Sequence, residues 1–135
     1  SKKNFKERKV IHVLAFRRED GILLGAITLD NLKRGAAQSC SIGYWIGEPF
    51  AGNGYMSEIL KALIFQAFKE FELSRIEAAT LPENKASRRL LEKSGFKYEG
   101  VGQSYLQIAG RWRNHVLYSL LRDDRRGKGK SLEDD

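Results

Sequence analysis

Residues 41–71 place a strand-like run, a glycine turn and a long amphipathic pattern one after another. The run at residues 41–47 is rich in β-forming side chains, and Gly52 and Gly54 follow it. Downstream, apolar side chains recur at the spacing of one helix face: Met56, Ile59, Leu60, Leu63, Ile64, Ala67, Phe68 and Phe71. A strand, a glycine turn and a helix start expose backbone N–H groups at the positive end of the helix dipole. The pattern therefore predicts an anion pocket, for which phosphate is the usual occupant.

Two familiar phosphate motifs do not fit this turn. The dinucleotide fingerprint needs a third glycine where this chain has Ser57. A Walker A loop ends in Gly-Lys-Ser or Gly-Lys-Thr, as residues 129–131 do, but Asp124 stands in place of its first glycine. The sequence therefore predicts neither of these phosphate sites.

A third pattern fits, and it is carried by two motifs together. Residues 49–54 (PFAGNG) resemble the acetyl-coenzyme A pyrophosphate loop of the GNAT acetyltransferase superfamily. Residues 84–96 (NKASRRLLEKSGF) look like the second GNAT signature, an Asn-initiated helix that closes on Gly-Phe. Residues 98–100 (YEG) and 110–116 (GRWRNHV) are similar to the ribosomal-protein-alanine N-acetyltransferase (RimJ/RimL-type) branch. The resemblance covers about residues 16–123.

The coarse pattern of elements predicts an α/β fold of the α+β type. Strands are expected at residues 10–16, 22–29, 38–47, 75–80, 97–106 and 115–121, with a hairpin turn at residues 19–21. A long helix follows Gly54, and a short helix begins at Asn84 and ends at Gly95. We expect a mixed, mostly antiparallel central sheet with flanking helices.

The resembled family places a further strand and a pair of helices before the first hairpin, where the helices form one wall of the acceptor site. The expectation is therefore a GNAT (acyl-CoA N-acyltransferase) fold lacking its first strand and helices, either as a short form or as a fragment. The coenzyme half of such a site is represented better than the acceptor half.

Length and charge predict one domain between two charged ends. The chain has 135 residues, of which 41% are hydrophobic and 30% charged, as in a globular protein. The net charge of +7 is concentrated in a basic arm at residues 1–9, so no direct nucleic-acid site is expected. Residues 10–123 would form the acetyltransferase domain. Residues 124–135 combine glycine and charge with almost no apolar side chains and are expected to be a disordered tail.

Cysteine and histidine usage predicts a cytoplasmic protein without a metal. No run approaches the ~18–20 apolar residues of a membrane span, and no signal-peptide block is present at the start. Cys40 is the only cysteine and is expected to be buried. His12 and His115 have no companion cysteines at zinc-ligand spacing.

The resemblance implies acetyl-coenzyme A as co-substrate and assigns residues to it. Backbone amides of one segment would bind the pyrophosphate: Ala51, Gly52, Asn53, Gly54, Tyr55, Met56 and Ser57. Trp45 and Ile46 would pair with the pantetheine arm as with an added strand, and their strand, splayed from its neighbour, would donate an N–H to the thioester carbonyl. Asn84 would hydrogen-bond the pantetheine, cap its helix, or do both. Pro49 stands where the family usually has Gln or Arg.

For the proton that the departing thiolate needs, the candidate is Ser87. It matches a serine that Rim-type enzymes present near the sulfur, although an ordinary helix-surface serine is the alternative. Many relatives use a tyrosine four residues further along, where this chain has Leu91. Lys85, Arg88 and Arg89 would either help to bind phosphates or form a solvated helix face.

The general base is less well marked. Positions at which Rim-type enzymes often place carboxylates hold Ser104 and Asn114 here. Glu48 and His115 are the remaining candidates, with a solvent-facing acid and a core histidine as alternatives. Tyr44, Tyr105 and Trp112 could line an acceptor groove or belong to the core.

We expect acetyl transfer to a primary amine, namely the N-terminal α-amine of a protein such as a ribosomal protein. An α-amine has a pKa near ~7.7–8.0 and a lysine near ~10.4, so deprotonating lysine costs about 3.5 kcal/mol more. The alternatives are a small-molecule amine as acceptor, or a truncated acyl-CoA-binding module without turnover. The oligomeric state is left open.

Overall fold

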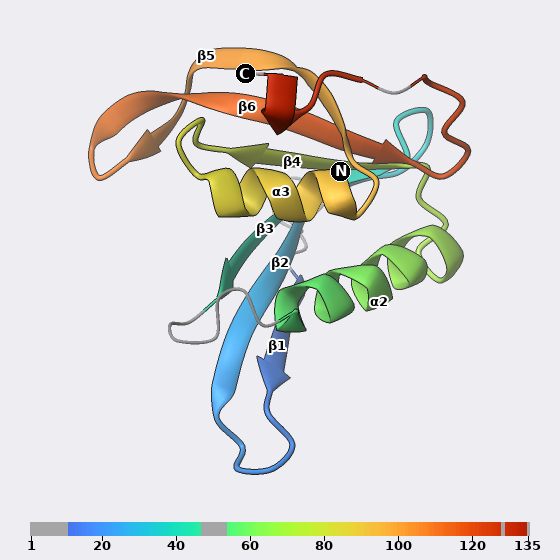
Figure 1. Ribbon diagram of the computed structural model, residues 1–135. Coiled ribbons are helices and arrows are strands. Elements are labelled where there is room, and N and C mark those ends of the chain that lie inside the picture. Colours follow the sequence, from blue (N-terminus) through green and yellow to red (C-terminus); the bar gives the residue numbers. More distant parts are fainter. Residues whose placement is uncertain (1–10, 47–53, 128, 135) are drawn as a thin grey trace, which may run out of the picture.

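The computed structural model describes residues 11–46, 54–127 and 129–134. Six strands form one sheet: β1 Ile11–Phe16, β2 Leu23–Lys33, β3 Ser39–Ile46, β4 Arg75–Thr80, β5 Lys97–Ile108 and β6 Arg111–Leu121 (Figure 1). The helices are α2 Tyr55–Lys69 and α3 Lys85–Lys93, followed by a short 3-10 helix, η1 Leu132–Asp134. The strands and helices that the sequence predicts are therefore present in the predicted order.

The sheet is mixed, as expected from the sequence. Its strand order is β1-β2-β3-β4-β6-β5, and only the β3–β4 pair is parallel. A parallel pair needs a long crossover connection, and α2 provides it between β3 and β4. The expected mixed, mostly antiparallel sheet with flanking helices is confirmed.

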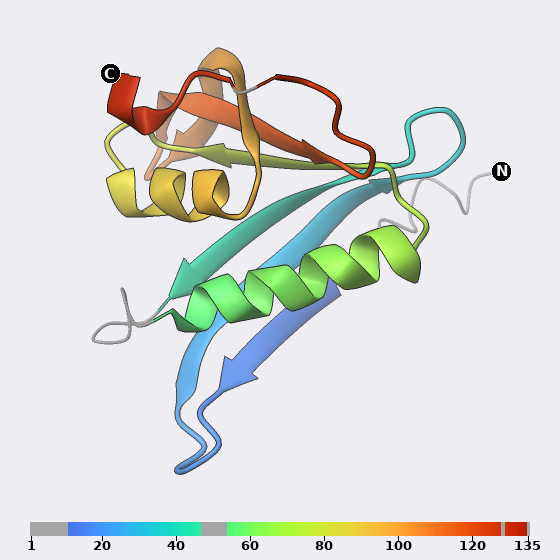
Figure 2. The ribbon, with the colours of Figure 1, turned by 45° about the vertical axis from the view of Figure 1, so that its right-hand side comes forward.

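Both helices pack on the same face of the sheet. One row of aligned, buried side chains crosses four neighbouring strands: Leu29, Ile42, Ala78 and Tyr118. Leu60 and Leu63 of α2 and Leu91 of α3 belong to the same core cluster as this row. Figure 2 shows α2 beside β1–β3 and α3 beside β4 and β6. The apolar periodicity of the helices is therefore explained by one continuous core.

The predicted turn between β1 and β2 is confirmed. Gly21 has φ 72°, which a glycine adopts without steric cost, and its N–H donates to the Arg17 carbonyl at 2.8 Å. Asp20 accepts a hydrogen bond from the Ile22 N–H at 3.1 Å and pairs with Arg17 at 2.6 Å. Hydrogen bonding from Arg17 lowers the pKa of the Asp20 carboxyl.

Three strands extend further than the sequence predicts. β2 continues to Lys33 past an irregularity after Asp30, and β5 continues to Ile108 past a bulge between Gly102 and Leu106. β6 begins at Arg111 instead of residue 115. Non-glycine residues with positive φ, such as Asn31 and Ser104, interrupt the alternation that marks a strand in sequence. The sequence therefore predicts the β5–β6 hairpin with strands that are too short.

The C-terminal segment differs from the disordered tail that its composition predicts. Within residues 124–127, the Arg126 side chain contacts Asp124 at 2.8 Å and Glu99 of β5 at 3.0 Å. Further along, the Leu132 N–H donates to Glu92 of α3 at 2.8 Å, and η1 contacts α3. Charged residues of this segment therefore find partners on the folded domain. The proposed limits of the basic arm and of the domain stay predictions, because residues 1–10 lie outside the described part.

Candidate active site

Strands β3 and β4 separate from each other halfway along β3. They are paired in register from Ser39 with Arg75 to Ile42 with Ala78. β3 stays paired with β2 up to Ile46, which lies opposite Gly25. The edge of residues 43–46 that faces β4 is therefore not paired with that strand, and Figure 2 shows β3 and β4 diverging. Such an edge offers backbone N–H and C=O groups to an extended ligand.

The start of α2 lies at the open end of β3. Gly54 has φ 81° and precedes the first helical residue without a side-chain cap. First-turn N–H groups of a helix have no partner within the helix and carry partial positive charge. Tyr55 and Ser57 are half-buried, whereas the Met56 side chain is buried in the core, so only its backbone could contact a ligand. Ala51, Gly52 and Asn53 lie outside the described residues.

Asn84 caps α3 as the sequence predicts. Its Oδ1 accepts a hydrogen bond from the Ser87 backbone N–H at 3.1 Å. Because the cap uses the amide oxygen, the Asn84 NH2 group is the part of the side chain suited to donate to a ligand. The cap is established, and the contact with pantetheine stays a prediction.

Ser87 is half-buried and faces β3. The Tyr44 hydroxyl donates to the Ser87 carbonyl at 3.0 Å and also contacts the Ser87 hydroxyl. Tyr44 belongs to the diverging half of β3, so this contact joins that strand to the first turn of α3. Burial raises the pKa of Tyr44, which keeps the phenol protonated at neutral pH. Ser87 is therefore part of a hydroxyl pair, which no sequence pattern predicts.

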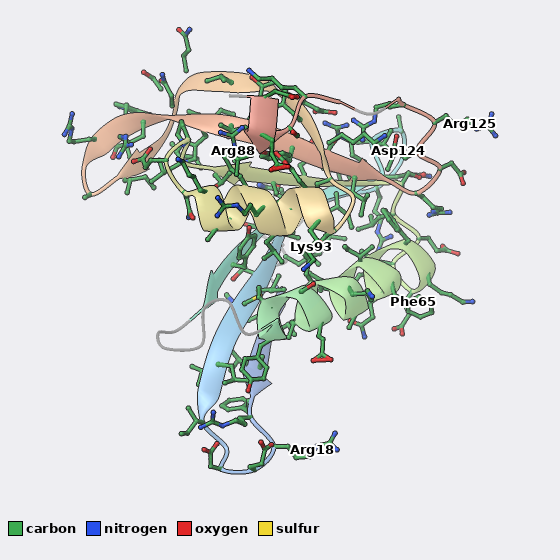
Figure 3. The ribbon with its side chains drawn as sticks, in the orientation of Figure 1. Arg18, Phe65, Arg88, Lys93, Asp124 and Arg125 are labelled. Carbon is green, nitrogen blue, oxygen red and sulfur yellow. The ribbon has the colours of Figure 1, made fainter. Side chains whose placement is uncertain are left out.

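Arg88 does not lie on a solvated helix face. Its side chain is only 4% exposed, and its Nε donates to the Tyr118 hydroxyl of β6 at 3.0 Å. Figure 3 shows it between α3 and the sheet. The Tyr118 hydroxyl in turn donates to Glu92 at 2.8 Å, and burial raises the pKa of Tyr118 to about 12. Arg88 is thus a structural residue, and of the three basic candidates Lys85 and Arg89 remain exposed and available for a phosphate.

Two residues at the expected carboxylate positions bind each other. The Ser104 N–H donates to Asn114 Oδ1 at 2.9 Å across the β5–β6 hairpin. Neither side chain can act as a strong base. In place of two carboxylates, the structure has a hydrogen bond between the two residues that stabilises the hairpin. Glu48, the other candidate base, lies outside the described residues.

His115 is buried on the sheet face opposite α3. It alternates along β6 with Val116 and Tyr118, which face the helices. Its Nδ1 lies 3.0 Å from the Arg113 carbonyl, which can only accept a hydrogen bond, so Nδ1 carries the proton. In the neutral ring Nε2 is then the acceptor. The Tyr105 ring lies beside it, with centroids 6.0 Å apart.

The three aromatic candidates for an acceptor groove are therefore divided. Tyr44 shares the helix-facing side of β3 with Cys40 and Ile42, and strand alternation could have placed it there. Tyr105 lies beside His115 on the other face, and Trp112 is 60% exposed. Tyr44 is thus tied to Ser87, and Tyr105 and Trp112 stay candidates for contact with an acceptor.

A cavity of about 430 Å³ lies between β1 and the start of α2. Its lining includes Val13, Phe16, Arg17, Leu24, Tyr55 and Ile59. No sequence pattern predicts this cavity, because its lining comes from separate segments of the chain. It lies on the outer edge of the sheet, away from Ser87.

Other chemical features of the described residues are few. No three His, Cys, Asp or Glu side chains within them gather in a group suited to a metal ion. Cys40 is buried, and burial raises the pKa of its thiol to about 12, which makes it a poor nucleophile. None of the helices in the described ranges is long and apolar enough to cross a membrane.

Comparison with known families gives one match. Residues 2–97 match the family model described as an acetyltransferase (GNAT) domain. The matched part includes β3, the start of α2, Asn84 and Ser87.

Several proteins are similar to this chain over most of its length. The probable N-acetyltransferase YjcK of Bacillus subtilis is 37% identical over 113 residues, which are 84% of this chain and 62% of that protein. The [ribosomal protein uS5]-alanine N-acetyltransferase of Escherichia coli is 39% identical over 76% of this chain and 53% of its own length. The structure of Mycobacterium smegmatis RimJ in complex with CoA-disulfide is 32% identical with a TM-score of 0.76, covering 87% of this chain and 56% of that one. The chain thus spans between half and two thirds of the length of these relatives.

Proposed function

Because the chain belongs to the acetyltransferase (GNAT) family, we propose that it transfers an acetyl group from acetyl-coenzyme A to a primary amine, the N-terminal α-amine of a protein. The observation that carries the proposal is the divergence of β3 from β4 beside the capped start of α3. This arrangement offers a strand edge, a helix start and a hydroxyl pair around one opening. Acetyl transfer from a thioester needs a binding edge for the donor, charge relief for the oxyanion and a proton for the thiolate.

The donor would lie along the diverging half of β3. Backbone groups of Trp45 and Ile46 would pair with the amides of the pantetheine arm, as an added strand pairs with a sheet edge. The pyrophosphate would lie at the start of α2, against the N–H groups of residues 51–57. The RimJ structure that holds CoA-disulfide supports this choice of donor.

The chemical step would use groups of β3 and α3. A β3 backbone N–H would donate to the thioester carbonyl and stabilise the developing oxyanion. Ser87, the candidate catalytic residue, would supply a proton to the departing thiolate. His115 is a candidate base on the opposite face through its Nε2, with an ordered water as the alternative.

Acidity and the names of the relatives support the proposed acceptor class. A site without a strong base suits an α-amine, whose pKa near ~7.7–8.0 leaves an appreciable neutral fraction at pH 7. The Escherichia coli relative is named for an alanine acceptor on a ribosomal protein. A ribosomal protein beginning with alanine is therefore the proposed acceptor, and a small-molecule amine is the second candidate.

Calorimetric titration with acetyl-coenzyme A, followed by thiol release on alanine-led peptides and on small amines, tests the proposal. Binding followed by release on an alanine-led peptide is the expected result. Thiol release only with small amines would identify a small-molecule amine as the acceptor. Coenzyme binding without thiol release on any amine would support a coenzyme-binding module instead. The absence of binding would overturn the donor assignment.

One variant tests the loop within the same titration. Gly54→Val places a β-branched side chain at φ 81°, which should displace the start of α2 and abolish coenzyme binding. Gly35→Val is the matched control, because Gly35 has φ 70° in the turn before β3. Equal loss of binding in both variants would point to a general folding defect.

A further inference from the structure

The Tyr44 hydroxyl contacts both the carbonyl and the hydroxyl of Ser87, so the two hydroxyl protons can be arranged in two ways. In the first arrangement, Tyr44 donates its single hydroxyl proton to the Ser87 carbonyl at 3.0 Å. Its oxygen can therefore only accept in the second contact, so the Ser87 hydroxyl proton points to Tyr44. In this arrangement Ser87 cannot donate to a sulfur atom, because its proton is already engaged.

A second arrangement of the same two hydroxyls removes this obstacle. If Tyr44 turns its proton from the Ser87 carbonyl to the Ser87 hydroxyl oxygen, the Ser87 proton becomes available to a third group. Both acceptors are already in contact with the Tyr44 oxygen, so the change needs only rotation about the phenol C–O bond. The pair can thus conduct a proton from Tyr44 outward through Ser87.

Acidity decides which of the two residues must lose the proton. An aliphatic hydroxyl resembles water, whose pKa is about 15.7. A thiol has a pKa near about 8.5, so proton transfer from serine alone to the thiolate would be unfavourable by a pKa difference of about seven. A phenol has an ordinary pKa near about 10, far closer to that of the thiol, and burial raises the pKa of Tyr44 above this value. Serine can deliver the proton only if another group replaces it.

We infer that Tyr44 is the proton source for the departing thiolate and acts through Ser87, which relays the proton. The inference rests on the proposed acetyl transfer. Tyr44 does not touch the sulfur in this scheme and is a positioning residue, since its hydroxyl sets where the Ser87 proton points. The residue comes from β3 and not from α3, so the hydroxyl pair spans the opening between the strand and the helix.

The proton balance of the step is complete. As the C–S bond breaks, an S–H bond forms and the Ser87 O–H bond breaks. The Tyr44 O–H bond breaks in the same step, and its proton restores the Ser87 hydroxyl. The acceptor nitrogen loses one proton when it becomes an amide, and this proton returns to the Tyr44 phenolate through solvent. The products are the N-acetylated amine and the free thiol.

Three variants test the inference in thiol-release kinetics with acetyl-coenzyme A: Tyr44→Phe, Ser87→Ala and the double variant. Each single change should lower kcat by about 100-fold, the lower end of the range for proton transfer by a positioned group. KM for acetyl-coenzyme A and its calorimetric Kd should stay within about twofold. Because the two residues act in series, the double variant should be no slower than the slower single variant.

The controls separate a proton path from loss of structure. Tyr98→Phe removes a half-buried phenol hydroxyl from β5, away from Ser87, and should leave kcat unchanged. Site-specific 3-fluorotyrosine at position 44 keeps the hydroxyl and should restore most of the activity that phenylalanine loses.

Two results would overturn the inference while acetyl transfer stands: an unchanged kcat in Tyr44→Phe, or a double variant whose loss is the product of the two single losses. A wild-type protein that releases no thiol with any amine would overturn the proposed function and this inference together.

Discussion

Arg75 of β4 and Glu99 of β5 form a bidentate ion pair across the intervening strand β6. Their contacts are 2.5 and 2.9 Å, and the Ser119 hydroxyl of β6 donates to the same carboxylate at 2.6 Å. Arg126 of the C-terminal segment adds a contact of 3.0 Å. One carboxylate therefore joins three parts of the chain on the sheet face that the helices leave uncovered.

Replacing Glu99 should make stability less dependent on pH in the acid range. Hydrogen bonding from Arg75 lowers the pKa of Glu99 from 4.5 to about 2. A carboxylate with a lowered pKa stabilises the folded state above its unfolded pKa, and this contribution is lost as the pH falls from about 4.5 to about 2. Glu99→Gln should lower the free energy of unfolding by about 1 kcal/mol at pH 7, since the pair is partly exposed. The difference from wild type should disappear near pH 2, as measured by urea denaturation. A difference that is constant with pH would contradict this assignment.

Tyr118→Phe should destabilise the fold more than Tyr98→Phe. The Tyr118 hydroxyl accepts from the buried Arg88 and donates to Glu92, so its loss removes two hydrogen bonds inside the protein. A lost partner of a buried polar group costs about 1–3 kcal/mol. Tyr98→Phe is the control. It keeps the Tyr98 ring, which packs edge-on against Tyr118, and removes only the hydroxyl. Chemical denaturation of both variants measures the difference, and equal stabilities would show that the Arg88–Tyr118–Glu92 chain contributes little.

Two substitutions of Asn84 should separate its two roles. Asn84→Ala removes the acceptor for the Ser87 N–H and should cost about 1 kcal/mol of stability. Asn84→Ser keeps a capping oxygen but has no NH2 group, so stability should stay near that of wild type. Under the proposed function both variants should bind acetyl-coenzyme A more weakly. Unchanged calorimetric affinity in Asn84→Ser would remove the side chain from the coenzyme site and leave the cap intact.

Gly102→Ala should displace Tyr105 from His115. A Cβ atom at position 102 would lie 2.5 Å from Cδ1 and 3.2 Å from Cβ of Tyr105, which is too close for the present ring position. Gly102 lies opposite His115 in the hairpin, so the change reaches that ring pair directly. Proton resonances of the His115 imidazole, which now lies beside an aromatic ring, should shift. Tyr105→Leu should produce a similar shift, and resonances that stay unchanged in both variants would show that the ring contact is absent in solution.

Local pattern was sufficient for most of the fold. β4 has the predicted bounds, Arg75–Thr80, and α3 begins after Asn84 as its cap predicts. The ends of β5 and β6 were not predictable by alternation, because Ser104 and Ala109 adopt positive φ without being glycine. The contacts of the C-terminal segment could not be predicted, because its composition does not reveal Glu99 and Glu92 as partners.

The candidate site was only partly predictable, because its contacts join distant segments. Gly54, Asn84 and Ser87 could be found from motifs that are each continuous in sequence. The contact of Tyr44 with Ser87 spans 43 positions and depends on how α3 sits on β3, which no local pattern encodes. Arg88 was expected on a solvated face, yet it is one turn from Leu91 and shares the buried side of α3.

The parallel pairing of β3 with β4 divides the sheet into two leaves, β1-β2-β3 and β4-β6-β5. The leaves are joined in register only between Ser39–Ile42 and Arg75–Ala78, with Cys40 and Ile76 buried side by side at that joint. A small change of angle at a hinge moves the far ends most. We therefore expect the packing of Cys40 and Ile76, at the closed end of the leaves, to influence the width of the opening at Tyr44. Substitutions that enlarge or shrink these two side chains should change the separation of the diverging ends more than that of the joint itself.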